Sequence, residues 1–586
     1  MSAYTYPGVY IEEISSGQHT ITGVATSIAA FIGWSNQGPA NEPVMVESWA
    51  DYQAAFGGMI PGIYLGYAVY QFFLNGGSQA YIVRLTHIDA KTASGTIGGL
   101  AFSAKNPGAW GNNVFLNITN VNTANKTFNL QVQMKNASGS TSVVESYTGL
   151  SAFQANPQYA VTAINNDSNY IDLNATPSGS PSAIAMPGVV SNSVAGAVTS
   201  GTFTAGEDVK QDTSGASATL LGGGPGAGPL IVGAITGAAD ATHDWVGQTS
   251  GAKFTPSAVP VVGTVAPLVS GTGAVTGQDG TQLQPNTADF ETQLTDATKG
   301  YVVLDKVPIF NLLCVPGEND SSIVNALQQY CATNRAFLIV DCALNDVVGT
   351  GSSGLSHTGP ADASGNALTG TFASNSAFYF PWVQAPDPMA GFRPAYFPPC
   401  GFVAGVYAST DASRGVWKAP AGINANVNGA LGLHTVLTDL QNGSLNPLGV
   451  NCLRQFPVYG NVVWGARTVA GADAMGSEWK YINIRRLALF LESSLYQGTQ
   501  WVVFEPNDEP LWSQVRLSIG SFMQQLFLKG AFAGTTPQQA YFVKCDGENN
   551  PVATTSQGIL NISVGFAPLY PAEFVVIQIQ QFMSQS

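Results

Sequence analysis

Charged residues are scarce in this chain. Lys, Arg, Asp and Glu make up 10% of its 586 residues, and 36 acidic against 21 basic side chains give a formal net charge of −15. A chain of this sign repels phosphate backbones, so nucleic acid is not an expected direct partner. Low charge combined with 45% hydrophobic residues also argues against a disordered polyelectrolyte and against a coiled coil.

Long apolar runs and an early basic region are also missing. No stretch of about 18 apolar residues occurs, and the first Lys or Arg is Arg84, so neither a membrane-spanning helix nor a secretory signal is predicted. The six cysteines form no CxxC motif and no zinc-like pairing with the five histidines. We therefore expect reduced, mostly buried thiols, no membrane insertion, no metal and no cofactor.

Composition divides the chain into a central segment and two flanking parts. Residues 88–300 are rich in Gly, Ser, Thr, Ala and Asn, and their short Val, Ile, Thr and Phe runs are interrupted by Gly, Asn or Pro. This spacing is typical of antiparallel strands and hairpins, which predicts a β-rich insertion. Taken alone, the segment would indicate a β-rich virion surface protein or an adhesin-like binding protein.

The flanking parts predict an α/β core. Continuous apolar runs, typical of strands buried on both faces, occupy residues 80–85, 301–307, 309–317 and 336–342. Between the last two runs, Asn319 or Asp320 can cap a helix that carries apolar side chains at helical spacing. Strand, helix and strand in this order favour a sheet with crossover helices, from which the β-rich segment is an insertion.

Two helices and a terminal strand are predicted near the C-terminus. Ile484, Leu487, Leu491 and Leu495 form one stripe of a helix over 479–496. A second helix is predicted to begin near the cap Asn507 and to end at about Gly530. The alternating residues 574–580 predict a strand at the chain end, where it needs a sheet edge to join.

Eight sequence blocks resemble those of a known family. They are YPGVYIEE (6–13), FIGWSNQGP (31–39), GVYASTDASRGVWKAPAG (405–422), LRQFPVYGNVVWGARTVA (453–470), KYINIRRLALFLESSL (480–495), WVVFEPNDEPLW (501–512), AYFVKCD (540–546) and PAEFVV (571–576). In this order they resemble the contractile tail sheath proteins of myophages and related contractile injection systems. The resemblance covers roughly residues 1–87 and 301–586.

The resemblance implies a fold class and domain boundaries. We expect an α/β core, composed of a subtilisin-like-fold sheath domain and an α+β C-terminal domain with terminal arm strands, and a large β-rich insertion domain. The expected divisions are an N-terminal arm and linker (1–30), the first part of the core (31–87), the surface-exposed insertion (88–300), the continued core (301–465), the C-terminal sheath domain (466–570) and the C-terminal arm strand (571–586).

The resemblance also implies a non-enzymatic structural function. Sheath proteins polymerise as six-fold discs stacked helically around an inner tube and contract to drive that tube through a target cell envelope. The implied partners are further copies of the chain, the inner tail tube protein, and baseplate and tail terminator proteins. The implied location is the virion tail or an injection-system particle, assembled in the bacterial cytoplasm.

In this family, arms of two neighbouring subunits add strands to a small sheet in a third. The arm residues implied here are Val9, Tyr10, Ile11, Phe574, Val575, Val576 and Ile577. Pairing of both termini within their own chain is the alternative.

Three basic residues are candidates for contact with the inner tube. Lys480, Arg485 and Arg486 lie off the apolar stripe of their helix, and an extended sheath must hold its tube through many weak contacts. The alternative is pairing within the subunit, with Glu492, Glu505 or Asp508, or contact with a neighbouring sheath subunit.

Catalytic sites are not predicted. Asp341 can end a strand, and His357 stands near Ser352, Ser353 and Ser356, but no sequence context of a catalytic triad surrounds them. The glycine-rich stretch near Gly222 lacks the Lys-Ser/Thr ending of a phosphate-binding loop.

Overall fold

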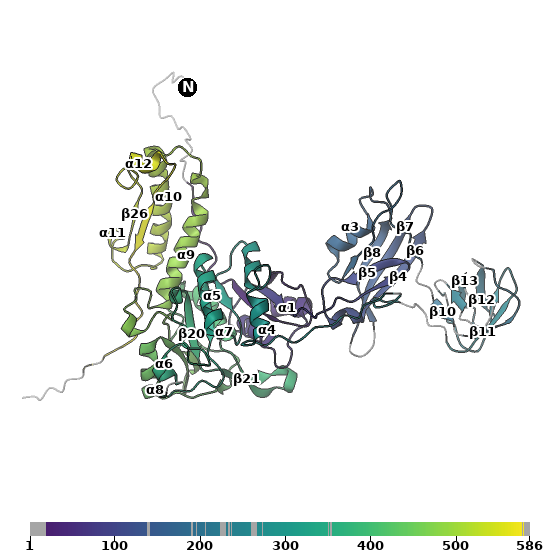
Figure 1. Ribbon diagram of the computed structural model, residues 1–586, viewed down its shortest axis with the longest axis horizontal. Coiled ribbons are helices and arrows are strands. Elements are labelled where there is room, and N and C mark those ends of the chain that lie inside the picture. Colours follow the sequence, from purple (N-terminus) through teal and green to yellow (C-terminus); the bar gives the residue numbers. More distant parts are fainter. Residues whose placement is uncertain are drawn as a thin grey trace, which may run out of the picture.

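A computed structural model describes residues 19–136, 141–188, 192–194, 196–204, 207–222, 230–232, 235, 237–259, 266–271, 273–349, 351, 354–576 and 578. An α/β core lies in the middle, an elongated C-terminal domain rises from one end of it, and two β-rich lobes extend in a row from the other end (Figure 1). The arm residues Val9, Tyr10, Ile11 and Ile577 lie outside the described residues.

The core is built on an eight-stranded sheet with the order β2-β3-β1-β18-β19-β20-β24-β25. The six inner strands are parallel, and an antiparallel strand closes each edge. The inner strands are buried on both faces, as continuous apolar runs require. The strands are β1 (Ala29–Trp34), β2 (Val44–Val46), β3 (Ala80–Leu85), β18 (Leu312–Cys314), β19 (Phe337–Asp341), β20 (Ser376–Phe380), β24 (Val450–Phe456) and β25 (Gly460–Val463).

Helices pack on this sheet and on one another. Helix α7 (Cys400–Arg414) approaches α2 (Tyr64–Leu74) closely, because Gly401 and Gly405 of α7 have no side chain. A Cβ at Gly401 would lie 2.4 Å from the Ala68 carbonyl oxygen of α2. The expected helix between two core strands is confirmed, and Asp320 caps it by accepting the amides of Ser322 and Ile323. The core helices are α1 (Trp49–Phe56), α2 (Tyr64–Leu74), α4 (Ala288–Leu294), α5 (Ser321–Thr333), α6 (Leu355–Thr358), α7 (Cys400–Arg414) and α8 (Asp439–Leu445).

One expected core strand is absent. Residues 301–307 were predicted as a buried strand, but Gly300–Lys306 form the 3-10 helix η2. Gly300 has a φ of 61°, a left-handed conformation that starts a tight turn instead of an extended strand. A small sheet of β21 (Val383–Asp387), β22 (Arg393–Phe397) and β23 (Gly432–Leu433) completes the core.

The insertion folds as two lobes, one nested within the other. The first lobe has its own hydrophobic cluster and consists of β4 (Ser94–Ile97), β5 (Leu100–Ala104), β6 (Val114–Asn122), β7 (Thr127–Lys135), β8 (Thr141–Ser151), α3 (Ala160–Asp167), β9 (Ile171–Leu173) and β17 (Ala266–Pro267). The second lobe forms a separate cluster around the buried Trp245 and consists of β10 (Asn192–Val194), β11 (Gly196–Ser200), β12 (Asp208–Gln211), β13 (Ser217–Gly222), β14 (Leu230–Val232), β15 (Trp245–Gly247) and β16 (Lys253–Pro256). Strand β17 returns to pair with β6, so the second lobe interrupts the first.

The two ends of the insertion meet beside the core. The backbones of Lys91 and Gln278 exchange two hydrogen bonds, each 2.9 Å between nitrogen and oxygen. Leu283, Phe290 and Leu294 already belong to the core cluster. The core therefore resumes about 17 residues earlier than the expected boundary at residue 300.

The C-terminal domain is an antiparallel helix pair with a two-stranded sheet. Its elements are α9 (Ile482–Gly498), α10 (Glu509–Leu528), α11 (Pro537–Ala540), β26 (Tyr541–Lys544), α12 (Val552–Thr555) and β27 (Ser563–Phe566). Helix α9 joins both hydrophobic clusters, because Ile482 and Leu489 lie in that of the core while Leu487 and Leu491 lie in that of this domain. The cap of α10 is Asp508, one residue after the predicted Asn507.

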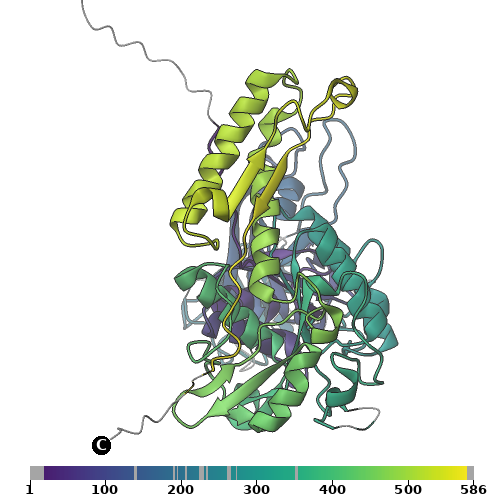
Figure 2. The same cartoon turned by 90° about the vertical axis from the view of Figure 1, so that its left-hand side faces the viewer.

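Both terminal segments cross between the domains. The N-terminal segment runs beside α9, where Ile21 is buried and the Val24 amide donates to Ser494 Oγ at 3.2 Å. The C-terminal segment descends from β27 along the C-terminal domain to the core and leaves at the opposite end of the molecule (Figure 2). No helix in the described ranges is long and apolar enough to cross a lipid bilayer.

Candidate assembly site

The two-stranded sheet of the C-terminal domain offers free edges. Strands β26 and β27 pair antiparallel from Tyr541 opposite Phe566 to Lys544 opposite Ser563, and the Ala567 amide donates to the Ala540 carbonyl at 2.8 Å. In such a ladder alternate residues exchange both hydrogen bonds, so Val543 and Phe566 direct their backbone groups away from the partner strand, whereas the outward amide of Tyr541 donates to the Pro537 carbonyl. A further strand can therefore pair on either side.

The side chains of this sheet divide between the two faces. Tyr541 and Val543 pack against the cluster formed with α9 and α10, and Tyr541 contacts Phe532. Phe542, on the other face, is 59% exposed. A short sheet with one face packed on helices is held in place while its edges stay accessible.

A buried ion pair anchors the C-terminal segment to the core. Arg467 is fully buried, and its Nε and Nη2 donate to Oε1 and Oε2 of Glu573 at 2.7 and 2.8 Å. The same carboxylate accepts Asn446 Nδ2 at 2.7 Å and the Tyr481 hydroxyl at 3.0 Å. Burial alone would raise the pKa of Glu573, but these donors outweigh it and hold the pKa below its ordinary value.

The segment beyond this anchor leaves the body of the protein. Phe574, Val575 and Val576 are 74%, 79% and 81% exposed. They do not form the predicted strand within the described residues, where nothing pairs with them. Three consecutive apolar side chains in water favour a partner outside this subunit.

The N-terminal segment is held at the far end of α9. His19 stacks on Trp501 with ring centroids 3.9 Å apart, and Ile21 packs beside Gly498. The chain before residue 19, with the predicted arm residues Val9, Tyr10 and Ile11, lies outside the described part. The two arms thus start from opposite ends of the C-terminal domain.

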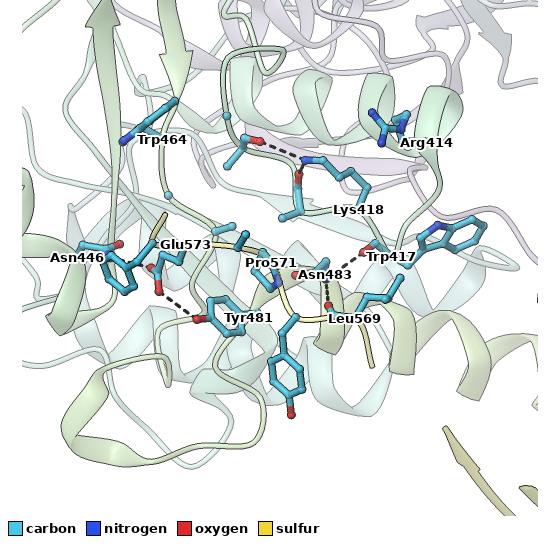
Figure 3. Close-up of a pocket in the computed structure, with 18 of the residues that line it drawn as sticks. Arg414, Trp417, Lys418, Asn446, Trp464, Tyr481, Asn483, Leu569, Pro571 and Glu573 are labelled. Carbon is cyan, nitrogen blue, oxygen red and sulfur yellow. Dashed lines mark hydrogen bonds between the residues drawn. The ribbon is translucent and has the colours of Figure 1, made fainter. Parts of the chain in front are cut away.

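An open cleft lies between the core and the C-terminal domain. Its volume is about 740 Å³, and the C-terminal segment from Leu569 to Phe574 forms one wall (Figure 3). Lys418 bends back to donate to the carbonyls of Ala419 and Ala421. The other basic and aromatic lining residues are Arg414, Lys529, Trp417, Trp464, Tyr481 and Tyr570.

The three residues predicted to face an inner tube all have partners within the chain. Lys480 pairs with Asp473 at 2.6 Å, and Arg485 with Glu492 at 3.3 Å. These contacts match the alternative of pairing within the subunit.

A tube-facing position is contradicted for Arg486. Its side chain is 3% exposed, as is that of its partner Asp411, and the two pair at 2.6 Å. Arg486 also donates to the Thr26 carbonyl, so it ties α9 to α7 and to the N-terminal segment. A helix periodicity cannot reveal a partner 75 residues away, which is why the sequence placed Arg486 on a polar face.

The residues considered for catalysis have structural contacts. Asp341 accepts the amides of Gly317 and Cys400 at 2.9 and 2.7 Å, and its complete burial raises its pKa to about 6. Ser356 bonds to Ser444, while Ser352 and Ser353 lie outside the described residues. Within the described residues no group of His, Cys, Asp and Glu could hold a metal ion, and all six cysteines are buried and unpaired.

Sequence reasoning missed the pair formed by Arg467 and Glu573. The two residues are 106 positions apart, and neither stands in a recognisable site motif. Both, however, lie in blocks that carry the family resemblance, 453–470 and 571–576. The sequence signal that could have revealed this pair is the presence of an arginine and a glutamate in two of these blocks.

Comparisons with known proteins agree on one family. Residues 306–469 match the phage tail sheath protein central domain, and residues 475–582 match the phage tail sheath C-terminal domain. A tail sheath protein of Vibrio phage KVP40 is 26% identical over 186 residues, which is 32% of this chain and 26% of that protein.

Solved sheath structures share the fold. The contracted sheath complex of the PVC extracellular contractile injection system aligns with a TM-score of 0.53, at 19% identity over 99% of both chains. A chain of the anti-feeding prophage baseplate aligns at 0.51, with 20% identity over 99% of this chain and 100% of that one. A sheath tail protein of Listeria innocua aligns at 0.51, with 12% identity over 90% of both. Residues 306–582 of this chain thus match the central and C-terminal domains of phage tail sheath proteins, and the chain as a whole shares its fold with solved sheath proteins.

Proposed function

We propose that this protein is the structural subunit of a contractile tail sheath. It polymerises as six-fold helical discs around an inner tube and contracts to drive that tube through a target cell envelope. The observation that carries this proposal is that one chain holds both a two-stranded sheet with free edges and an apolar terminal segment that has no partner in the described part of the chain. Such complementary features suit a polymer of identical subunits.

Arm exchange connects the subunits. The N-terminal arm of one neighbour and the C-terminal arm of another pair with the outer edges of β26 and β27. Self-pairing is disfavoured for the C-terminal arm, because its anchor Glu573 bonds to Arg467 of the core. The C-terminal segment descends from β27 to the core and so leads away from the sheet (Figure 2). Each added strand contributes about 1 kcal/mol per backbone hydrogen bond, so two short arms hold a subunit while it rotates against its neighbours.

The remaining features follow from this assignment. The subunit performs no catalysis, the central sheet follows a subtilisin-like topology, and the β-rich lobes project from the outer surface. Lys480 and Arg485 remain proposed contacts of the tube, since both can exchange an exposed carboxylate partner for one on the tube. The inner tube, baseplate and tail terminator proteins are the other proposed partners, in a tail or injection-system particle assembled in the bacterial cytoplasm.

Electron microscopy of the purified full chain tests the proposal. We expect hollow helical tubes or six-fold rings from the full chain. Deletion of residues 574–586 keeps the anchor Glu573 and should give a folded monomer. The double variant Val575→Ser/Val576→Ser should weaken assembly, while Val458→Ser, at an equally exposed site outside the arms, should assemble normally.

Two outcomes would contradict this proposal. Ordered tubes from the truncated chain would rule out exchange of the C-terminal arm. Monomers or trimers from the full chain, with no rings or tubes, would favour a β-rich surface or adhesin-like protein instead.

A further inference from the structure

The loop between α9 and α10 presents an aromatic side chain to water. Phe504 is 103% exposed, and the preceding Val503 is 59% exposed. The φ of Phe504 is 71°, a left-handed conformation that bulky residues rarely adopt. A strained and fully exposed aromatic residue points to a role outside the isolated subunit, because neither folding nor solubility favours it.

The next residue in this loop adds a negative charge. Glu505 is exposed, and its carboxylate forms no ion pair within the part of the chain that the structure describes. The neighbouring acidic residues are engaged: Asp508 caps α10, and Glu509 pairs with Arg516. The loop therefore carries the exposed aromatic side chain of Phe504, followed by the carboxylate of Glu505, which has no ion-pair partner in the described residues.

The cleft beside the C-terminal segment has the complementary character. Across the described ranges, Arg414 and Lys529 form no ion pair, and Lys418 donates only to carbonyl groups. Three cations in one cleft are conspicuous in a chain with 21 basic residues and a net charge of −15. Trp417, Trp464 and the other aromatic walls give the cleft apolar surfaces, and about 740 Å³ is a volume typical of sites that enclose a bulky group.

Loop and cleft lie at opposite ends of the helix pair. The loop follows the last turn of α9 and precedes the first of α10, whereas the cleft is lined by Tyr481, just before α9, and by Lys529, just after α10. The helix α10 alone spans about 30 Å at 1.5 Å per residue. The loop of a subunit therefore cannot reach its own cleft, and contact between the two requires a second copy.

We propose that Phe504 of one copy docks into this cleft on a second copy, with Glu505 facing the basic residues of the rim. Such a head-to-tail contact joins two different surfaces and propagates into an open helical array. It is also continuous with the proposed arm contacts. The loop adjoins Trp501, on which His19 at the base of the N-terminal arm stacks, and the cleft adjoins the base of the C-terminal arm.

This inference deepens the proposed function, since it assigns a second contact within the same polymer. Cysteine crosslinking of the full chain tests it. Copies carrying Val503→Cys, which keeps Phe504, are mixed with copies carrying Leu569→Cys, a residue of the cleft, and are oxidised mildly. The six native cysteines are buried and leave only the introduced thiols to react.

A disulfide-linked dimer that contains one copy of each variant is the expected product. Val503→Cys mixed with Ile88→Cys, at a site 86% exposed beside the insertion, is the matched control and should give none. Tubes without the expected dimer would overturn the docking and leave the sheath proposal standing. The dimer without tubes would support the docking and contradict the sheath, and absence of both would overturn both.

Two substitutions measure what the contact contributes. Phe504→Ala should raise the critical concentration for assembly by about tenfold or more, as expected for a buried aromatic anchor. Val552→Ala, at a site 81% exposed in the same domain, should leave it unchanged.

Charge reversal tests the pairing of the loop with the cleft rim. Glu505→Lys and Lys529→Glu should each impair assembly, and combining them should restore it in part. If Phe504→Ala and the unsubstituted chain assembled at the same critical concentration, the inference would be overturned.

Discussion

Arg467 and Glu573 form a two-pronged ion pair between the last part of the core and the base of the C-terminal arm. The guanidinium also donates to Asp473 at 2.9 Å, so a fully buried cation is shared by two carboxylates. Any pull on the arm reaches the core first at Glu573. In the proposed sheath, load on a paired C-terminal arm would pass to the core through this pair.

Removing the cation should strongly destabilise the folded chain. Arg467→Ala leaves Glu573 half-buried without its main partner, and loss of one member of a buried pair typically costs about 3–5 kcal/mol. The measurement is the midpoint of urea unfolding. Asp439→Asn removes a partner of Arg454 that is 93% exposed and should cost under about 1 kcal/mol. Equal urea midpoints for the two variants would show that the Arg467–Glu573 pair contributes no more stability than the exposed pair of Arg454 and Asp439.

The anchor should fail in acid. The pKa of Glu573 lies below its unfolded value, so the ionised form stabilises the fold above that unfolded value, and this contribution is lost as the pH falls through the folded pKa. We expect the stability difference between the natural chain and Glu573→Gln to be largest at pH 7 and to shrink as the pH falls below 4.5 through the folded pKa. The other carboxylates titrate in both proteins. The difference between the two urea midpoints, measured at several pH values, therefore reports the contribution of Glu573. A difference that stays constant with pH would contradict the assignment.

The elements that the sequence predicted well are those set by local chemistry. The helix that begins after Asp320 has a capping carboxylate and an apolar stripe, and both signals lie within a few residues. The run 301–307 was misjudged because apolar composition alone does not separate a strand from a short helical turn. The nested second lobe was not predicted either, since the return of β17 to β6 is a contact across about 150 residues.

In the candidate assembly site, too, features set by the local sequence were accessible to prediction, and features set by the packing of distant elements were not. Apolar segments at both chain ends are visible in the sequence, and the structure shows Phe574, Val575 and Val576 exposed, while their pairing as arm strands stays a prediction. The partners of Arg467 and Arg486 were not predicted, because each is brought close only by the packing of distant elements. The cleft and the exposed Phe504 also depend on tertiary structure, since no sequence pattern reports which side chains stay unpaired.

Glu318 should make the fold less stable at alkaline than at mildly acidic pH. Its burial raises its pKa to about 7, even though the amides of Asn286 and Asp320 donate to it. A raised carboxyl pKa means that the folded state binds the proton more tightly, so stability falls as the pH rises from about 4.5 to 7. The shift corresponds to roughly 3 kcal/mol.

Glu318→Gln should remove this part of the pH dependence. Thermal unfolding at pH 5 and at pH 8 provides the test, with Glu548→Gln, at an exposed carboxylate, as the control. The natural chain and the control should both lose stability between these pH values, and Glu318→Gln should lose less. Identical losses in all three would contradict a raised pKa at Glu318.

Charge reversal at Arg486 should prevent folding, so this substitution is not a suitable test of contact with the inner tube. A glutamate there would face Asp411 in a site where both side chains are 3% exposed, and two buried carboxylates repel each other. We expect insoluble or unfolded protein from Arg486→Glu, by circular dichroism and solubility. Lys480→Glu, which removes a partly exposed pair, should stay folded and is therefore the suitable variant for testing the tube contact. A folded Arg486→Glu would show that this pair is dispensable.

The insertion should be removable at the point where its ends meet. Lys91 and Gln278 already exchange two backbone hydrogen bonds, so an Asn-Gly turn in place of residues 92–277 closes a hairpin without moving the core. Arg84 loses its bond to the Pro107 carbonyl but keeps those to Ser35 and Gly38.

This shortened chain should fold and assemble, as judged by thermal unfolding and electron microscopy. Excision of residues 88–300 is the control, and it should fail. That wider cut also removes Leu283, Phe290 and Leu294 from the core, and each lost apolar side chain costs about 2–5 kcal/mol. Insolubility of the shorter excision would mean that the first lobe supports the core. Assembly after the wider excision would place the boundary at residue 300 after all.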